Sequence, residues 1–227
     1  MEYEAKKLGR INTGEVYQVA APLDEQIKAF RAKKISYPFL AYPDEVAQIR
    51  LSSISNDHSR TSMTAVSLKK ARTILLREPL LMNDITASEA TRANTNAQYL
   101  MRGKVLYEVA EARAKSEEGL APEDRTACII SQEGDFDLTP EMPDSRFIIR
   151  SQTSDYFAEK TNGRITFFCL PGQSKNKTTL NYLWFGSPRN KSYIECGNGD
   201  LCDGIRAFGL LRYIEGNTQR FNLSYTK

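Results

Sequence analysis

Histidine and closely paired cysteines are scarce in this chain of 227 residues, and their scarcity removes several kinds of site. The only histidine is His58, so a site that needs two or three imidazoles cannot form within one chain. The cysteines at 128, 169, 196 and 202 lack the spacing of zinc knuckles. We expect no structural metal and no cofactor. Cys196 and Cys202 flank a short turn that a disulfide could span, but we expect reduced thiols.

Long apolar runs and phosphate-binding motifs are also missing. No apolar run approaches the roughly 20 residues that cross a bilayer, and the N-terminus has no hydrophobic signal segment. We therefore expect a cytoplasmic protein without a membrane partner. Neither G-x-x-x-x-G-K-S/T nor G-x-G-x-x-G occurs, which excludes the familiar loops that cradle phosphate groups.

The N-terminal half shows apolar periodicity that predicts helices. Thr86 and Glu89 have the spacing of a capping box. From there an apolar stripe recurs every three or four residues, at Ala90, Ala93, Ala97, Met101, Val105, Val109 and Ala112. The stripe predicts a long helix over 87–118, and a second pattern predicts a helix over 65–78. We expect the two to form an αα-hairpin, preceded by a polar surface loop over 52–62.

After residue 119 the period of the apolar residues changes from about 3.6 to about 2. Segments rich in Ile, Phe, Tyr, Thr and Leu alternate with turn residues, at 127–131, 146–151, 164–170, 179–185, 192–196, 205–214 and 220–225. This pattern predicts a mostly antiparallel sheet with short connections. The expected fold class is α+β, with a mostly helical part over 1–121 and a β-rich part over 122–227, either as two parts or as one continuous domain.

The charge is distributed unevenly along the chain. Residues 145–227 hold twelve Lys and Arg against six Asp and Glu, whereas the preceding part has a slight acidic excess. Basic residues occupy two predicted turns, Lys175 and Lys177 in one and Arg189 and Lys191 in the other. The aromatic strand between these turns carries Trp184. Cations that meet phosphates beside rings that stack on bases are a common arrangement for single strands. We therefore expect a nucleic-acid-binding protein for single-stranded RNA or DNA.

Two other classes of function stay open. The alanine-rich stripe of the long helix permits close helix approach, which would suit a non-enzymatic assembly protein that forms a homo-oligomer or binds a protein partner. Asp135 and Asp137 would share one face of a strand, which would suit a metal-dependent hydrolase. The sequence favours a binding protein over an enzyme and assigns no catalytic residue.

Overall fold

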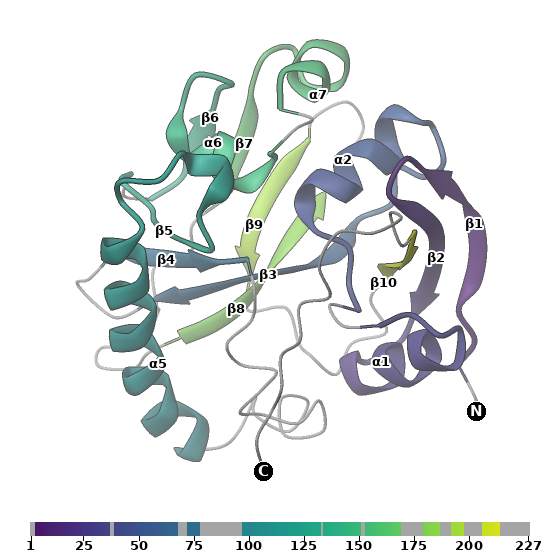
Figure 1. Ribbon diagram of the computed structural model, residues 1–227, viewed down its shortest axis with the longest axis horizontal. Helices are drawn as coiled ribbons and strands as arrows, with labels where there is room; N and C mark the ends of the chain where they lie inside the picture. The colour runs from purple at the N-terminus through teal and green to yellow at the C-terminus, as the bar shows by residue number, and fades with distance from the viewer. Residues whose placement is uncertain are drawn as a thin grey trace.

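The computed structural model describes residues 3–36, 39–67, 72–77, 97–132, 134–150, 153–168, 179–186, 192–197 and 206–213. In this part of the chain, ten strands form one mixed sheet in the order β1-β2-β10-β3-β8-β9-β7-β6, and β4 joins β3 to β5 (Figure 1). The strands are β1 (Lys6–Ile11), β2 (Gly14–Ala20), β3 (Ser59–Ser67), β4 (Thr73–Leu76), β5 (Ala127–Ile129), β6 (Phe136–Leu138), β7 (Ile165–Phe168), β8 (Thr179–Gly186), β9 (Tyr193–Gly197) and β10 (Arg206–Arg212). Strands from both ends of the chain therefore alternate within the sheet.

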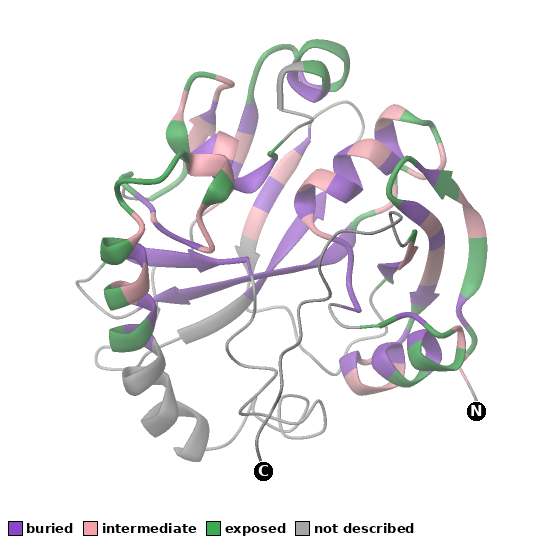
Figure 2. Cartoon of the chain, in the orientation of Figure 1, coloured by how far each residue is buried: buried purple, intermediate pink, exposed green. Residues whose placement is uncertain are grey.

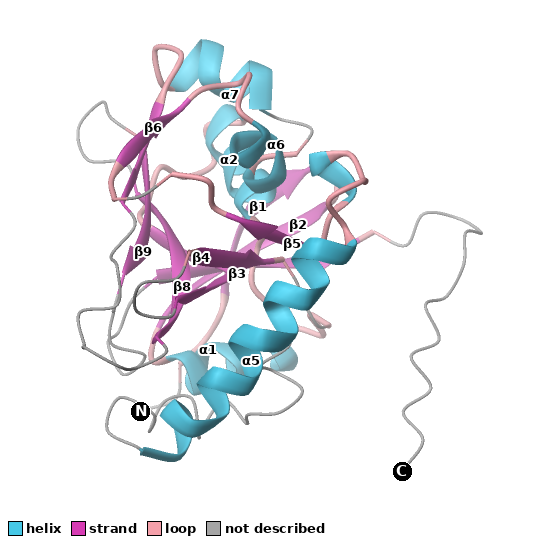
Figure 3. Cartoon of the chain, turned by 90° about the vertical axis from the view of Figure 1, so that its left-hand side faces the viewer, coloured by secondary structure: helices cyan, strands magenta, loops and turns pink. Residues whose placement is uncertain are grey.

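Most neighbouring strands run antiparallel, but the pairs β10–β3 and β7–β9 are parallel. The helices are α1 (Leu23–Ala32), α2 (Pro43–Leu51), α5 (Ala97–Ser116), α6 (Pro143–Ile148) and α7 (Thr153–Lys160), with a 3-10 turn η2 (Pro122–Asp124). None of the helices in the described ranges is long and apolar enough to cross a membrane. Figure 3 shows α2, α6 and α7 grouped toward one side of the sheet and α1 and α5 toward the other.

The face under α2, α6 and α7 carries the largest apolar core. Successive side chains of a strand point to opposite faces. Met63 and Ala65 of β3 and Leu183 and Phe185 of β8 therefore all reach this core. The helices contribute side chains such as Val46, Ile49, Phe147 and Phe157, each at most 1% exposed. This face of the sheet is thus sealed by helices.

The opposite face is covered at its two flanks. Helix α1 packs on β2 and β10, where the Phe30 ring lies over Gly209. Helix α5 packs on β3, β4 and β5 through Tyr107, Ala110 and Ala114. Figure 1 shows α5 and α1 on the two sides of β3 and β8. Every residue of β3 is buried, as the unbroken purple strand in Figure 2 shows, because both faces and both edges of this strand have neighbours.

The predicted helical N-terminal part with a long αα-hairpin is wrong. Within the segment 65–78, residues 65–67 form the end of β3 and residues 73–76 form strand β4, and the two pair antiparallel. Ile74 and Leu76 face α5, whereas Leu75 faces the other core. A short segment that is buried on both faces cannot be told from a buried helix by its periodicity. The expected surface loop over 52–62 is also wrong at its end, because Ser59–Ser62 are buried in β3.

Helix α5 lies within the long helix predicted over 87–118, and 87–96 fall outside the described residues. Its buried face, however, differs from the predicted stripe. Ala110 is fully buried, whereas its neighbour Val109, which belongs to the predicted stripe, is 46% exposed. The sheet contacts the face that carries Tyr107, Ala110 and Ala114, and the two alanines on it allow close approach of the helix.

Candidate functional site

Trp184 of β8 is one of the five residues that the sequence singles out, and it lies inside the protein, with 3% of its surface exposed. Lys175, Lys177, Arg189 and Lys191 lie outside the described residues. The candidate site therefore consists of the residues around Trp184. They form a strip of β8, β9 and β7 on the sheet face whose flanks lie under α1 and α5.

A row of four rings crosses this strip, and we call it the aromatic row: Phe168, Tyr193, His58 and Trp184. The Phe168 and Tyr193 centroids are 5.6 Å apart, and the Tyr193 and His58 centroids are also 5.6 Å apart. His58 and Trp184 follow at 5.3 Å. Interplanar angles between 68° and 74° make each contact edge-to-face, the geometry that aromatic quadrupoles favour. Phe168 and Tyr193 are half-buried and His58 is exposed, so all three rings reach the surface.

An arginine extends the row beneath the surface. The guanidinium of Arg60 in β3 lies 5.0 Å from the Trp184 ring centroid and 5.6 Å from that of Tyr182. Its Nη1 donates a hydrogen bond to the side-chain oxygen of Gln26 at 3.3 Å. A cation over an indole face is the most favourable cation–π geometry. Trp184 is thus held between His58 and Arg60 and supports the row from within.

Strand alternation and a glycine build the row. Tyr182, Trp184 and Gly186 occupy alternate positions of β8 and share one face of the sheet. Tyr193 lies opposite Gly186 on β9. A Cβ at position 186 would be 2.1 Å from the Tyr193 ring, so only glycine leaves the ring in place. The sequence Tyr-Leu-Trp-Phe-Gly therefore supplies both a ring and the space for the next ring.

His58 lies between two rings at the start of β3. Burial lowers the pKa of its imidazole, and the positive charge of Arg50 lowers this pKa further. The ring is therefore neutral at neutral pH and combines one N–H donor with one acceptor. A neutral imidazole can stack on a planar ligand and bond to its edge.

Arg50 fixes the backbone under this end of the row. It is 1% exposed, and Nη1 donates to the Tyr156 hydroxyl at 2.9 Å and to the Gly186 carbonyl at 3.1 Å. Nη2 donates to the Phe185 carbonyl at 2.8 Å. Burial lowers the pKa of Arg50, yet these oxygens compensate its charge. Arg50 thus ties α2 and α7 to the end of β8 and belongs to the support of the site.

The carboxylates near the row differ in their partners. Asp137 of β6 forms an ion pair with Arg164 at 3.4 Å and accepts a hydrogen bond from Thr166 at 2.9 Å. Glu195 of β9 lies between the rings, opposite Trp184 on one side and Phe168 on the other. It is half-buried, and no side chain among the described residues forms an ion pair or hydrogen bond with its carboxylate.

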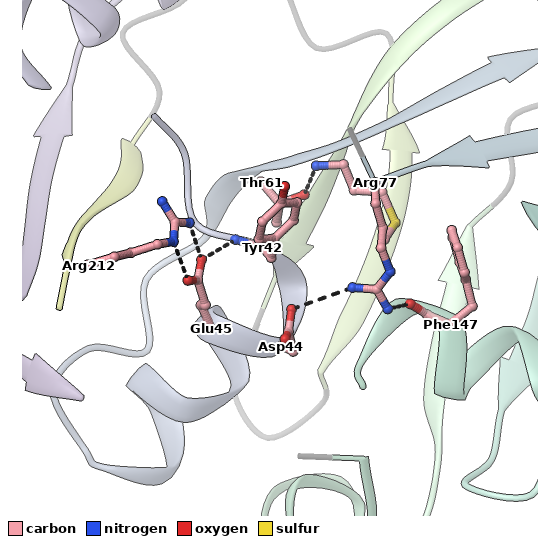
Figure 4. A network of polar contacts seen from close by, with 8 residues as sticks. Tyr42, Asp44, Glu45, Thr61, Arg77, Phe147 and Arg212 are labelled. Atoms are coloured by element: carbon pink, nitrogen blue, oxygen red, sulfur yellow. Dashed lines mark hydrogen bonds and ion pairs between the residues drawn. The ribbon is translucent and has the colours of Figure 1, made fainter. Parts of the chain in front are cut away.

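A second polar cluster, at the start of α2, is closed within the protein (Figure 4). Glu45 accepts bonds from Arg212 Nε at 2.9 Å and Arg212 Nη2 at 2.7 Å, and also from the backbone N–H of Tyr42. Arg77 donates to the Phe147 carbonyl and lies 3.9 Å from Asp44. Burial lowers the pKa of Arg77 to about 9. These charged groups face one another and join α2 to β10 and α6, so we assign them a structural role.

The predicted metal site at Asp135 and Asp137 and the thiol of Cys128 are poorly suited to catalysis. Asp135 is exposed just before β6, and Asp137 is already bound by Arg164 and Thr166. Within the described ranges, no three His, Cys, Asp or Glu side chains are grouped to hold a metal ion. Cys128 is a buried free thiol whose pKa is raised to about 12 by burial and then by Asp144, so it is a poor nucleophile.

Sequence reasoning found Trp184 but missed Phe168, Tyr193 and Glu195 as parts of one site. A usable signal was present: a ring, a second ring and a glycine at alternate positions of a strand, followed after five intervening residues by Ser-Tyr-Ile-Glu. His58 gave no such signal, because its contact with Trp184 joins segments that are far apart in the chain. In comparisons with known proteins, no protein-family model, curated protein or solved structure matches the chain.

Proposed function

We propose that this protein binds single-stranded RNA or DNA on the strip of β7, β9 and β8. The observation that supports the proposal is the aromatic row, in which the half-buried rings of Phe168 and Tyr193 and the exposed ring of His58 lie on a sheet face. Rings on a sheet offer stacking surfaces for bases that are not held in a duplex. Trp184 takes a different part in this proposal from the one expected from sequence, since it supports His58 from below.

Charge along the chain agrees with a polyanionic ligand. Arg164 directly precedes β7, and Arg206 pairs with Asp57, the neighbour of His58 in the sequence; their side chains are 68% and 56% exposed. Their ion pairs with Asp137 and Asp57 are exposed, and such pairs contribute little to stability, so phosphate can replace either carboxylate. In the sequence, four further cations occupy the connections that follow β7 and β8, namely Lys175, Lys177, Arg189 and Lys191.

Fluorescence anisotropy with short labelled oligonucleotides tests the proposal. The logarithm of the binding constant should fall linearly with the logarithm of salt concentration, by about 0.7 per phosphate neutralised on a single strand. Tyr193→Ala should weaken binding roughly 5- to 150-fold, because stacking contributes about 1–3 kcal/mol per base. The matched control is Tyr213→Ala, which removes an exposed tyrosine beyond the end of β10. Reversing the charge at Lys175, Lys177, Arg189 and Lys191 should flatten the salt dependence.

Two results would overturn the proposal. One is that folded protein binds no oligonucleotide at low salt. The other is that Tyr193→Ala, Phe168→Ala and Tyr213→Ala bind equally well, since stacking on the row must distinguish them. Circular dichroism of each variant separates loss of binding from loss of folding.

A mass above that of the monomer, reduced by Val109→Asp, would support the assembly role of α5, because Val109 is exposed on that helix.

A further inference from the structure

Glu195 occupies the middle of the aromatic row. On β9 it lies opposite Trp184 of β8, and on its other side it pairs with Phe168 of β7. Directly opposite residues of paired strands have Cβ atoms about 4.5–5.5 Å apart and share a face. Burial raises the pKa of Tyr193, and the negative charge of Glu195 raises it further, which agrees with a carboxylate close to that ring.

Among the residues that the structure describes, the carboxylate of Glu195 lacks the partner that its counterparts have. Asp137 has Arg164 at 3.4 Å, and Asp57 has Arg206 at 3.7 Å. Among the described residues, no cation or donor takes this place for Glu195. A carboxylate that is half-buried beside apolar rings loses part of its hydration, which is unfavourable. Hydrogen bonds from the N–H donors of a ligand would compensate this loss and so stabilise the complex. The position therefore favours a planar ligand with donors along its edge.

The hydrogen-bonding edges of the bases decide which ligand fits. An ionised carboxylate only accepts hydrogen bonds, through two oxygens that lie side by side. Among unpaired bases, guanine presents two adjacent donors, N1–H and the N2 amino group. Adenine and cytosine each place an acceptor next to the amino group, and uracil and thymine place acceptors on both sides of N3–H. Only guanine can therefore bond to both oxygens at once without placing an acceptor against the carboxylate.

We infer that Glu195 makes the aromatic row selective for guanine, with a guanine ring stacked on Tyr193 or Phe168 and its N1–H and N2 amino group bonded to the carboxylate. The inference rests on the proposed binding of single strands. It also accounts for a negative charge at the centre of a surface for a polyanion. The carboxylate repels phosphate weakly in every complex, but only in the complex with guanine does it accept two hydrogen bonds from the base edge.

The test measures binding of short uridine-rich RNAs that differ in one central base: guanine, inosine, adenine or uracil. Guanine should bind roughly 5- to 150-fold more tightly than adenine or uracil, the usual range for one bidentate base contact. Inosine, which lacks the N2 amino group, should fall between them. Glu195→Gln should bring all four RNAs within about twofold of one another, because the amide places a donor against the guanine donors.

The control variant is Glu118→Gln, which removes an exposed carboxylate at the end of α5 and should leave the preference for guanine unchanged. Equal binding of all four RNAs by the wild-type protein would overturn the guanine inference and leave the proposed function intact. A preference that survives in Glu195→Gln would overturn it as well. Failure of every RNA to bind would overturn the proposed function itself, so the two failures are distinguishable.

Discussion

On one face of the sheet, the flank formed by β3, β4 and β5 lies under α5, whereas the strip of β8, β9 and β7 carries the aromatic row. The flank packs through apolar side chains, with Val66, Ile74 and Leu76 fully buried against α5. The row instead packs ring edge against ring face and leaves Tyr193 half-buried.

The difference separates two uses of one sheet face. Where a helix covers the strands, burial contributes about 25 cal/mol per Å² of apolar surface removed from water, and nothing remains for a ligand to contact. Along the row, part of that contribution is absent, but His58 and Glu195 keep polar atoms near the surface. We therefore expect substitutions on the flank to change stability and substitutions in the row to change ligand contacts.

The largest effect is expected on the flank, from a pair of adjacent substitutions in α5. Ala110→Asp places a carboxylate where the native residue is fully buried, and it should lower the free energy of unfolding by more than about 3 kcal/mol. Val109→Asp changes a residue that is 46% exposed and should cost less than about 0.5 kcal/mol. Urea melts of both variants provide the measurement. Equal costs would mean that α5 does not bury the face seen here.

An intermediate effect is expected from Gly186→Ala, which acts on the row itself. The added Cβ would meet the Tyr193 ring at 2.1 Å, so the ring must move, at a cost of about 1–3 kcal/mol by analogy with overpacked cores. The near-ultraviolet circular dichroism of the row should change with it. Gly119→Ala is the matched control, because nothing lies within 4 Å of its new Cβ. An unchanged spectrum for Gly186→Ala would contradict the close contact between Tyr193 and the strand.

The smallest effect is expected from the protonation of His58. Its pKa in the folded protein is lowered from 6.5, first by burial and then by Arg50. The unfolded chain therefore binds the proton more readily, and stability should fall as the pH drops through 6.5 toward the folded value. Above 6.5 both states are neutral, and this contribution is constant. Melting temperatures across this range should decline less in His58→Phe than in the wild type; identical slopes would contradict a lowered pKa for His58.

Local patterns in the sequence were sufficient for part of the fold. Period-2 alternation between turn residues predicted segments that contain β5, β7 and β10 and that cover all but the last residue of β8 and β9. The same reasoning failed for 146–151, where Phe147 and Ile148 belong to α6. There a short apolar run is buried on all sides, and such a run has no period that distinguishes strand from helix.

The candidate site was predictable only in one residue. Trp184 stands out in the sequence as the only tryptophan on an aromatic strand, but its burial depends on His58 and Arg60, which come from the other half of the chain. Tyr193 and Glu195 sit within a predicted strand, yet their neighbours depend on the register between β7, β9 and β8. A shift of one residue in that register would move each side chain to the opposite face.

The sequence by itself therefore indicated most of the strands after residue 119, the helical character of α5 and the basic character of residues 145–227, because composition and period are properties of neighbouring residues. Only the tertiary structure decided that Ala110 rather than Val109 is buried, that 65–67 and 73–76 belong to paired strands, and that Glu195 lies between two rings. These features arise from contacts between segments distant in the chain, where packing against the partner overrides local preference.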